Sequence, residues 1–560
     1  MAENSFGANI IEILTSGMYQ DSKVIYREYI QNACDQIDKA ERLGILNPRN
    51  AESKYPDLGQ GVVNIWLKQE DRYIAIEDNA TGIKAEDFQR TLLAIADSDK
   101  IMGEDKGFRG IGRLCGLAYC KRLIFTSRWG GEDVVSIMSC DAQKMHEMIN
   151  EANTKVKRHS ADDVITAMTA FSTRPANSSD PKHFFKVELI DINEENEELF
   201  GGRDENNIEQ LSNYLSFVAP VPYQTNFYYR SEIYNHAKSL NARIDEYDIR
   251  INGKPIFKKY KTHLKTGNGL DEVFGVQFHD FFADDGSLLG WMWFGETSFK
   301  AAIREEEISR GLRLRKENIQ IGGGDTLRDM FTRDRRGNSY FIGEIFAVSR
   351  ELIPNSQRSY FNENFTRLKF EQALKDYFNN TLYHIYYDGS YINTRVKKIN
   401  MAEEAVAKFE EKTSEGFVTT EERVREEQEL QVKVQEAEKA RREIEKKRET
   451  GRSILTSKII ERRADEIPPV GENKAAGSFS AISSTPENDN SGVAVTKNDN
   501  GTSTYKPKQK FLVDTMFPHA SRSERKLLSE TLDKIFVIIQ KSTDRKTSEK
   551  IISAIREGLR

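Results

Sequence analysis

The chain has 560 residues, of which 38% are hydrophobic and 30% charged, and its net charge is −6. This length exceeds what one hydrophobic core organises, so we expect three or four structural units. The charge balance does not indicate a dedicated nucleic-acid binder, no long apolar run indicates a membrane span, and the N-terminal residues show no signal-peptide pattern. We therefore expect a cytoplasmic protein whose four cysteines are reduced.

Residues 1–204 carry the pattern of one layered domain. Apolar residues recur at helical spacing between 8 and 40, which predicts two helices. Alternating or apolar runs then predict strands at 62–68, 73–77, 122–128, 133–140 and 183–192. This order of helices and strands is typical of an α/β sandwich.

Residues 205–398 carry a second α/β pattern. The strand candidates, in chain order, are EYDIRINGKPI, LLGWMWFG, LRLRKENIQIG and YFIGEIFAVS. A helix is predicted near 366–380, where it would close the unit. We expect a second, middle α/β domain.

Residues 399–465 are strongly charged and helical in pattern. Leu430, Ala437 and Ile444 are seven residues apart, Val434 fits a second seam position, and Arg441 interrupts the seam. The pattern leaves two alternatives open, a weak coiled coil and a solvated helix.

The remaining residues divide at about position 510. Residues 466–510 are rich in Gly, Ser, Asn, Pro and Thr, which is typical of a disordered linker. Residues 511–560 regain helical spacing and carry two apolar stripes that two short helices cannot bury on each other alone. We expect this C-terminal helical segment to dock on a partner or on a second copy, and packing against the chain's own body is the alternative.

A first chemical motif is REYIQNACDQIDKA at 27–40. Glu28 and Asn32 are four residues apart, so on a helix they share one face. Nucleotide hydrolysis needs a group that orients water and an oxygen ligand for Mg²⁺, and a carboxylate with a carboxamide can supply both. A solvated helix surface with this spacing is the alternative.

A second motif is IAIEDNATGI at 74–83, where a strand ends at Asp78. A buried carboxylate at that point can accept a hydrogen bond from an adenine amino group. Gly82 would let the backbone approach the ring. An ordinary turn with an aspartate cap is the alternative.

A third motif is GFRGIGRLCGL at 107–117, in which Gly107, Gly110 and Gly112 precede an apolar helix. Backbone N–H groups of such a loop, together with the helix N-terminus, favour phosphate groups. The three motifs follow one another within about ninety residues, each on the type of element that the chemistry requires.

Together these motifs resemble a known superfamily. The stretch YQDSKVIYREYIQNACDQIDKA is similar to the opening of the ninety-kilodalton heat-shock chaperones, and the second and third motifs resemble their D-x-G-x-G and G-x-x-G-x-G. GFRG followed by RLIFTSR is also similar to MutL and MORC proteins. The resemblance to these gyrase, chaperone, histidine-kinase and MutL (GHKL) ATPases implies a Bergerat-type sandwich that binds ATP and Mg²⁺.

The resemblance also implies roles for single residues. Glu28 would be the hydrolytic base, Asn32 the Mg²⁺ ligand and Asp78 the adenine-reading carboxylate. The other residues expected to border the nucleotide and its lid are Asp35, Ala80, Gly82, Ile83, Ser98, Gly107, Arg109, Gly110, Ile111 and Gly112.

The resemblance covers about residues 5–380. RGLRLRKENIQIG and GEIFAVSRELIPNSQRSYF are similar to the chaperone middle domain, whose L-P-L-N-x-S-R loop carries an arginine to the γ-phosphate. Asn355 and Arg358 stand at the matching positions, which implies a catalytic role for Arg358. An arginine from a second domain neutralises charge only when the domains close. A surface arginine in a loop is the alternative.

Several positions depart from the chaperone pattern. Ala80 stands where a glycine is usual, and Phe185 stands where the last strand usually offers a Gly-Thr pair. The lid between Ser98 and Gly107 is short, as in MutL, and nothing after residue 400 resembles either family's dimerisation domain.

These features predict an ATP-hydrolysing conformational clamp. We expect a homodimer formed through the N-terminal and C-terminal helical segments, acting on a protein client or effector, with nucleic acid left open as a partner and bacterial (anti-phage) defence as one setting. The alternative is a catalytically degenerate scaffold that keeps the ATPase fold.

Overall fold

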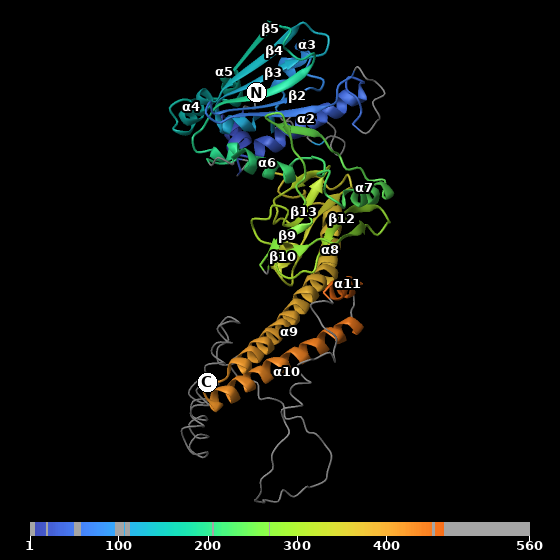
Figure 1. Ribbon diagram of the computed structural model, residues 1–560. Coiled ribbons are helices and arrows are strands. Elements are labelled where there is room, and N and C mark those ends of the chain that lie inside the picture. Colours follow the sequence, from blue (N-terminus) through green and yellow to red (C-terminus); the bar gives the residue numbers. More distant parts are fainter. Residues whose placement is uncertain are drawn as a thin grey trace, which may run out of the picture. The chain divides into compact units, whose positions relative to one another are not determined.

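The computed structural model describes residues 6–17, 21–49, 58–95, 106, 112–203, 207–267, 269–450 and 454–463 (Figure 1). The predicted linker at 466–510 and the predicted docking segment at 511–560 lie outside the described residues. Within the described part, no helix is both long enough and apolar enough to cross a bilayer.

The first domain is built on an eight-stranded sheet in the order β5-β4-β3-β6-β2-β1-β7-β8. All neighbouring strands are antiparallel except β1 and β7, which are parallel. The strands are β1 Val62–Lys68, β2 Tyr73–Asp78, β3 Cys120–Arg128, β4 Val134–Asp141, β5 Thr169–Pro175, β6 Phe184–Ile192, β7 Asp248–Ile251 and β8 Lys254–Pro255.

The helices of this domain pack on the sheet through one apolar core. α2 (Val24–Arg42) buries Ile25, Ile30 and Ile37 in the same cluster as residues of β1, β2 and β3. The other helical elements in this region are α1 Asn9–Glu12, continued by a π-helical turn at Ile13–Gly17, then α3 Ala85–Leu93, α4 Ala142–Asn153, α5 Ala161–Met168, α6 Asn207–Val218 and α7 Arg230–Ser239, with short 3-10 turns at Gly112–Ala118 and Glu197–Phe200.

The first sheet extends beyond the boundary expected at residue 204. The segment EYDIRINGKPI was expected in the second unit, but β7 pairs with β1, with Val62 opposite Asp248. Ile249 and Ile251 are buried in the first core. β1 and β7 are parallel neighbours that lie far apart in the chain, and the segment between β6 and β7, which carries α6 and α7, brings the chain back beside β1.

The second domain contains a five-stranded sheet in the order β11-β12-β15-β13-β14, with a two-stranded ribbon of β9 and β10. Its strands are β9 His263–Thr266, β10 Gly269–Glu272, β11 Gly275–Phe282, β12 Leu288–Glu296, β13 Gly311–Lys316, β14 Ile319–Ile321 and β15 Ile342–Ala347. Short 3-10 turns lie at Arg328–Met330 and Arg335–Tyr340. Trp291 and Trp293 on β12 are fully buried in a cluster rich in aromatic side chains.

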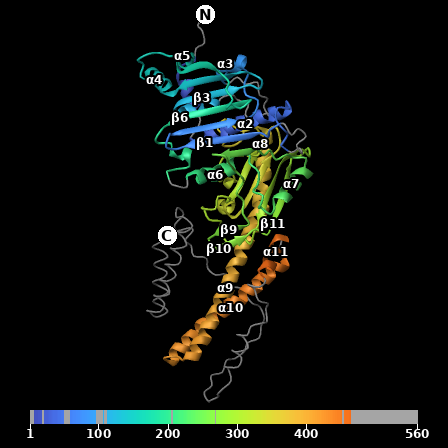
Figure 2. The same cartoon turned by 45° about the horizontal axis from the view of Figure 1, so that its top comes forward.

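The helix predicted near 366–380 is α8 (Phe365–Tyr377), and it does not end the unit. It continues through a π-helical turn at Phe378–Leu382 into α9 (Tyr383–Glu415), so no structural break falls at residue 398. α10 (Thr420–Thr450) lies beside α9 in both Figures 1 and 2, and α11 (Ile454–Arg462) follows it.

The spacing of seven residues in α10 marks its contact face. Leu430, Ala437 and Ile444 are buried, and the last two belong to the core cluster that also contains residues of α9. Arg441 is buried as well, and its guanidinium donates to Glu403 of α9 at 3.1 Å. This face of α10 therefore packs against the same chain, while Val432 remains exposed.

Candidate active site

Helix α2 presents polar side chains beside its buried apolar face. Glu28 and Asn32 lie one turn apart, as predicted from their spacing, and both are half-buried. Asp35, one turn further, is 3% exposed. Ile25 and Ile37 face the core. The packing of the apolar face thus fixes how α2 presents these oxygen-bearing side chains.

Asp78 is the last residue of β2 and is held in the centre of the sheet. It pairs in register with Val63 of β1 and Phe185 of β6. Its carboxylate is 3% exposed and accepts a hydrogen bond from the Ala80 N–H at 3.0 Å. Burial raises the pKa of Asp78 to about 8, because one backbone N–H compensates only part of the lost hydration. Such a carboxyl group is suited to a further hydrogen-bond donor.

The turn after Asp78 can be formed only with glycine at position 82. Gly82 has φ +67°, and a Cβ there would overlap the carbonyl oxygen of Arg128. The Ile83 N–H donates to Ser127 Oγ at 2.8 Å, and Thr81 Oγ1 donates to Gln36 Oε1 at 2.9 Å. The turn is therefore fixed between β3 and α2, with its backbone close to both.

Two residues near this turn were not predicted from sequence. The Ala80 carbonyl oxygen lies 2.6 Å from His183 Nδ1, and Thr81 is fully buried. Ala80 itself is buried, so its methyl group is part of the packed turn. Neither His183 nor Thr81 has a local pattern that would single it out, since their contacts come from distant elements.

The glycine-rich motif is only partly described. Ser98, Gly107, Arg109, Gly110 and Ile111 lie outside the described residues. Gly112 begins a short 3-10 helix, Gly112–Ala118.

Gly112 lies directly against Glu28. A Cβ on Gly112 would overlap the Glu28 carboxylate. The Tyr29 hydroxyl donates to the Arg113 carbonyl at 3.0 Å and accepts from the Gly116 N–H at 3.1 Å. These bonds hold the start of this turn against α2.

Arg358 reaches α2 from the second domain. It is 7% exposed, its Nε lies 3.9 Å from Glu28 Oε1, and its guanidinium also donates to the carbonyl of Lys106. Its backbone has φ +52°, and its N–H donates to the Asn355 carbonyl at 3.0 Å. The structure thus brings the two residues predicted to be catalytic together.

Asn355 lies in the same loop as Arg358. Its side chain accepts from the Ser359 N–H at 3.0 Å and donates to Ser359 Oγ at 2.9 Å. These bonds close the loop that carries Arg358. Asn355 therefore shapes the loop that carries Arg358.

Lys106 is a further residue that sequence reasoning missed. Its N–H donates to Asp35 Oδ1 at 3.0 Å, and its ammonium lies 2.7 Å from Asp38 Oδ2. Burial by itself would raise the pKa of Asp38. The Lys106 ammonium and the Arg49 guanidinium outweigh this effect and hold the pKa of Asp38 below its ordinary value. A single lysine before a glycine carries no signal in the sequence, because its partners lie far away along the chain.

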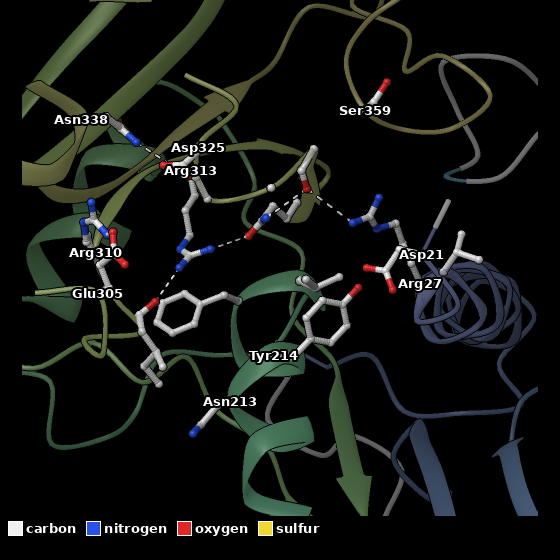
Figure 3. A pocket seen from close by; sticks show the side chains of 18 of the residues that line it. Asp21, Arg27, Asn213, Tyr214, Glu305, Arg310, Arg313, Asp325, Asn338 and Ser359 are labelled. Atoms are coloured by element: carbon white, nitrogen blue, oxygen red, sulfur yellow. Dashed lines mark hydrogen bonds and ion pairs between the residues drawn. The ribbon is translucent and has the colours of Figure 1, made fainter. Parts of the chain in front are cut away.

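A cavity of about 760 Å³ lies on the Arg27 side of α2 (Figure 3). Arg27 donates to the Gly322 carbonyl at 3.5 Å, and Arg313 lies over the Phe217 ring at 4.2 Å. The lining comes from α2, α6 and loops of the second domain, and Asn32, Asp78 and Gly82 are not part of it. This cavity is therefore distinct from the predicted nucleotide residues.

The sequence of the first domain matches a known protein family. Residues 24–173 match the sequence model of the family described as "Histidine kinase-, DNA gyrase B-, and HSP90-like ATPase". The matched segment contains α2, the Asp78 turn and most of the first sheet. This part of the chain is a GHKL-type ATPase domain.

Similar curated proteins are molecular chaperones. The chaperone protein HtpG of Sulfurovum sp. (strain NBC37-1) is 25% identical over 163 residues, which is 26% of each chain. HtpG of Orientia tsutsugamushi (strain Boryong) is 33% identical over 93 residues, 16% of this chain and 14% of the relative. Heat shock protein 90-6, mitochondrial, of Arabidopsis thaliana is 24% identical over 155 residues, which are 26% of this chain and 18% of the relative. The chain thus spans about a quarter or less of these relatives' length.

Proposed function

We propose that this protein binds ATP with Mg²⁺ and hydrolyses it, using α2, the Asp78 turn and Arg358. The observation that carries the proposal is the convergence of Glu28 and Arg358, 3.9 Å apart, although they come from different domains. A buried carboxylate beside a glycine turn lies in the same ATPase domain.

The chain's residues suit the substrate in three respects. The buried Asp78 carboxyl group accepts one weak backbone bond and favours a further donor, which an adenine amino group supplies. The Gly82 turn has no side chain at the point of closest approach. Asn32 offers a carboxamide oxygen one turn from Glu28, and Mg²⁺ bound to phosphates needs only one or two protein ligands.

Each residue then has a stated role. Mg²⁺ supplies charge neutralisation at the phosphates when it is bound. Asn32 holds the ion, Glu28 accepts a hydrogen bond from the attacking water and orients it, and Arg358 neutralises charge on the terminal phosphate. Because Arg358 belongs to the second domain, hydrolysis depends on the placement of that domain.

We further propose that this dependence makes the protein a conformational clamp. A homodimer would close when ATP binds and reopen after hydrolysis, acting on a protein or nucleic-acid partner. Turnover is then slow, because closure limits the rate. Size-exclusion chromatography with light scattering, with and without a non-hydrolysable ATP analogue, tests the oligomeric part of this proposal.

One observation favours the second candidate, a scaffold that keeps the fold without the activity. Phe185 lies directly opposite Asp78 in the register of β2 and β6, and its ring lies 6.1 Å from that of Phe125. An aromatic side chain at the pocket floor could fill the space that adenine needs. Binding of ATP to the purified protein decides between the two candidates.

The test measures ATP binding by calorimetry and hydrolysis by phosphate release, for wild type, Glu28→Gln and Asp78→Asn. We expect Glu28→Gln to bind without hydrolysing and Asp78→Asn to bind about 10- to 100-fold more weakly. Asp87→Asn, an exposed carboxylate on α3 paired with Arg90, is the matched control and should behave as wild type. Wild-type protein that neither binds nor hydrolyses ATP would refute the proposal.

A further inference from the structure

Lys106 is held at three separate points. Its N–H donates to Asp35 of α2 at 3.0 Å, and its carbonyl accepts from the Arg358 guanidinium. Its ammonium lies 2.7 Å from Asp38 and 3.6 Å from Asp245. The side chain is 5% exposed, so these are buried interactions and not surface ion pairs. Main chain and side chain are thus positioned independently.

The carbonyl and the ammonium of Lys106 are both connected to the second domain by polar contacts. The carbonyl contacts that domain directly, because it accepts a hydrogen bond from Arg358. The ammonium is connected indirectly. It pairs with Asp245, and the Asp245 backbone carbonyl accepts a hydrogen bond from Asn318 Nδ2 at 2.6 Å. Asn318 belongs to the two-residue turn between β13 and β14, and its Oδ1 accepts from the buried Lys258 ammonium at 2.7 Å. Lys106 therefore bridges α2 and two places in the second domain.

The surroundings keep Lys106 charged. Burial alone would lower its pKa, but Tyr247, Asp245 and Asp38 raise it above the ordinary value. The Tyr247 hydroxyl donates to both oxygens of Asp38, at 2.9 Å each, which fixes the carboxylate that faces the ammonium. A neutral side chain at position 106 would leave Asp38 and Asp245 without this partner.

The Arg358 guanidinium contacts both Glu28 and the Lys106 carbonyl. Its Nε is 3.9 Å from Glu28, a distance at which the ion pair alone sets no fixed geometry. The bond to the Lys106 carbonyl supplies the directional contact. We propose that Lys106 is a positioning residue that holds Arg358 beside Glu28 and so couples the second domain to the ATPase site. This inference rests on the proposed function for its kinetic consequence only.

The kinetic test compares Lys106→Met with wild type in the full chain. We expect kcat to fall about 10- to 100-fold, the range for loss of a buried charge-assisted contact, while the affinity for a non-hydrolysable ATP analogue changes less than about twofold. Lys106→Arg should retain most of the activity, because it keeps the charge and the backbone. Lys369→Met is the matched control, since Lys369 pairs with the exposed Asp284 far from these residues.

A double variant separates coupling from general damage. If Lys106 acts through Arg358, adding Lys106→Met to Arg358→Lys lowers kcat no further. Multiplicative losses would overturn the proposal, because two residues that act independently have additive free energies. An unchanged kcat in Lys106→Met would overturn it as well.

Hydrogen exchange tests the coupling even if the protein proves to have no ATPase activity. In nucleotide-free protein, Lys106→Met should increase amide exchange in the peptide containing residues 355–359, where the N–H groups of Arg358 and Ser359 bond to Asn355. Lys369→Met should leave that peptide unchanged. Unaltered exchange at 355–359 in Lys106→Met would refute the coupling, whatever the outcome of the ATPase assay.

Discussion

Replacing Asp78 by Asn should have two opposite effects, a loss of nucleotide binding and a gain of stability in the nucleotide-free protein. The gain arises because the folded protein raises the pKa of this carboxyl group from 3.8 to about 8 by burial. Between those values the folded chain holds a proton that the unfolded chain has released. Stability therefore falls as the pH rises through this window.

The magnitude follows from the size of the shift. One pKa unit corresponds to about 1.4 kcal/mol, so a shift of about four units (from 3.8 to about 8) sets an upper limit of about 6 kcal/mol above pH 8. Water entering the turn reduces this penalty, and we expect about 1–3 kcal/mol at pH 8. For a domain of this size, that corresponds to a rise in melting temperature of about 2–10 °C.

The assay is thermal unfolding of wild type and Asp78→Asn between pH 5 and 9, without nucleotide. Wild type should lose stability with increasing pH relative to the variant, and the difference between the two curves should shrink as the pH falls toward 5. Asp87→Asn provides the control for removing an exposed carboxylate.

Binding is measured on the same samples. A non-hydrolysable ATP analogue should bind Asp78→Asn about 10- to 100-fold more weakly, since the carboxamide NH2 group is a donor placed where the adenine amino group needs an acceptor. Parallel stability curves for wild type and variant across the pH range would show that Asp78 is not a buried, proton-binding carboxyl group, and the reasoning would fail.

Three further predictions concern stability and are measured by urea unfolding. Gly82→Ala should destabilise the protein by at least about 2 kcal/mol, because the new Cβ overlaps the Arg128 carbonyl at a positive φ; wild-type stability would contradict this. Ala437→Glu should cost about 2–4 kcal/mol at the α9–α10 contact, whereas Val432→Glu on the exposed face should cost less than about 0.5 kcal/mol, and equal effects would disprove the assigned face. Glu344→Gln should cost about 3–5 kcal/mol, since it leaves buried Lys258 and Arg315 without their carboxylate; a neutral result would mean that the network adds nothing.

Local sequence patterns were sufficient where the chemistry depends on nearby residues. The spacing of Glu28 and Asn32 places them one turn apart on α2, since helical geometry relates residues four apart directly. Gly82 was singled out because a residue without a side chain lets the backbone approach a ligand, and the structure adds that its φ is positive. The buried residues of α10 follow the seven-residue spacing, although the sequence left open whether this face packs on a helix or is solvated.

Contacts between residues far apart in the chain could not be predicted from local sequence patterns. The segment at 248–251 looks like any alternating strand, and only its pairing with Val62 and its neighbours assigns it to the first sheet. Local alternation specifies that a strand has two faces, but not which strand lies beside it. For this reason the sequence did not show that the first sheet extends beyond residue 204.

The sequence by itself thus determined which residue types lie on α2, that Gly82 could let the backbone approach a ligand beside Asp78, and which class of ATPase the first motifs resemble. The tertiary structure decided that Arg358 lies beside Glu28, that Lys106 bridges α2 and the second domain, and that β7 completes the first sheet. The physical reason is that periodicity and turn chemistry act over a few residues. Contacts across 252 positions, such as that between Arg358 and Lys106, depend on how whole domains pack.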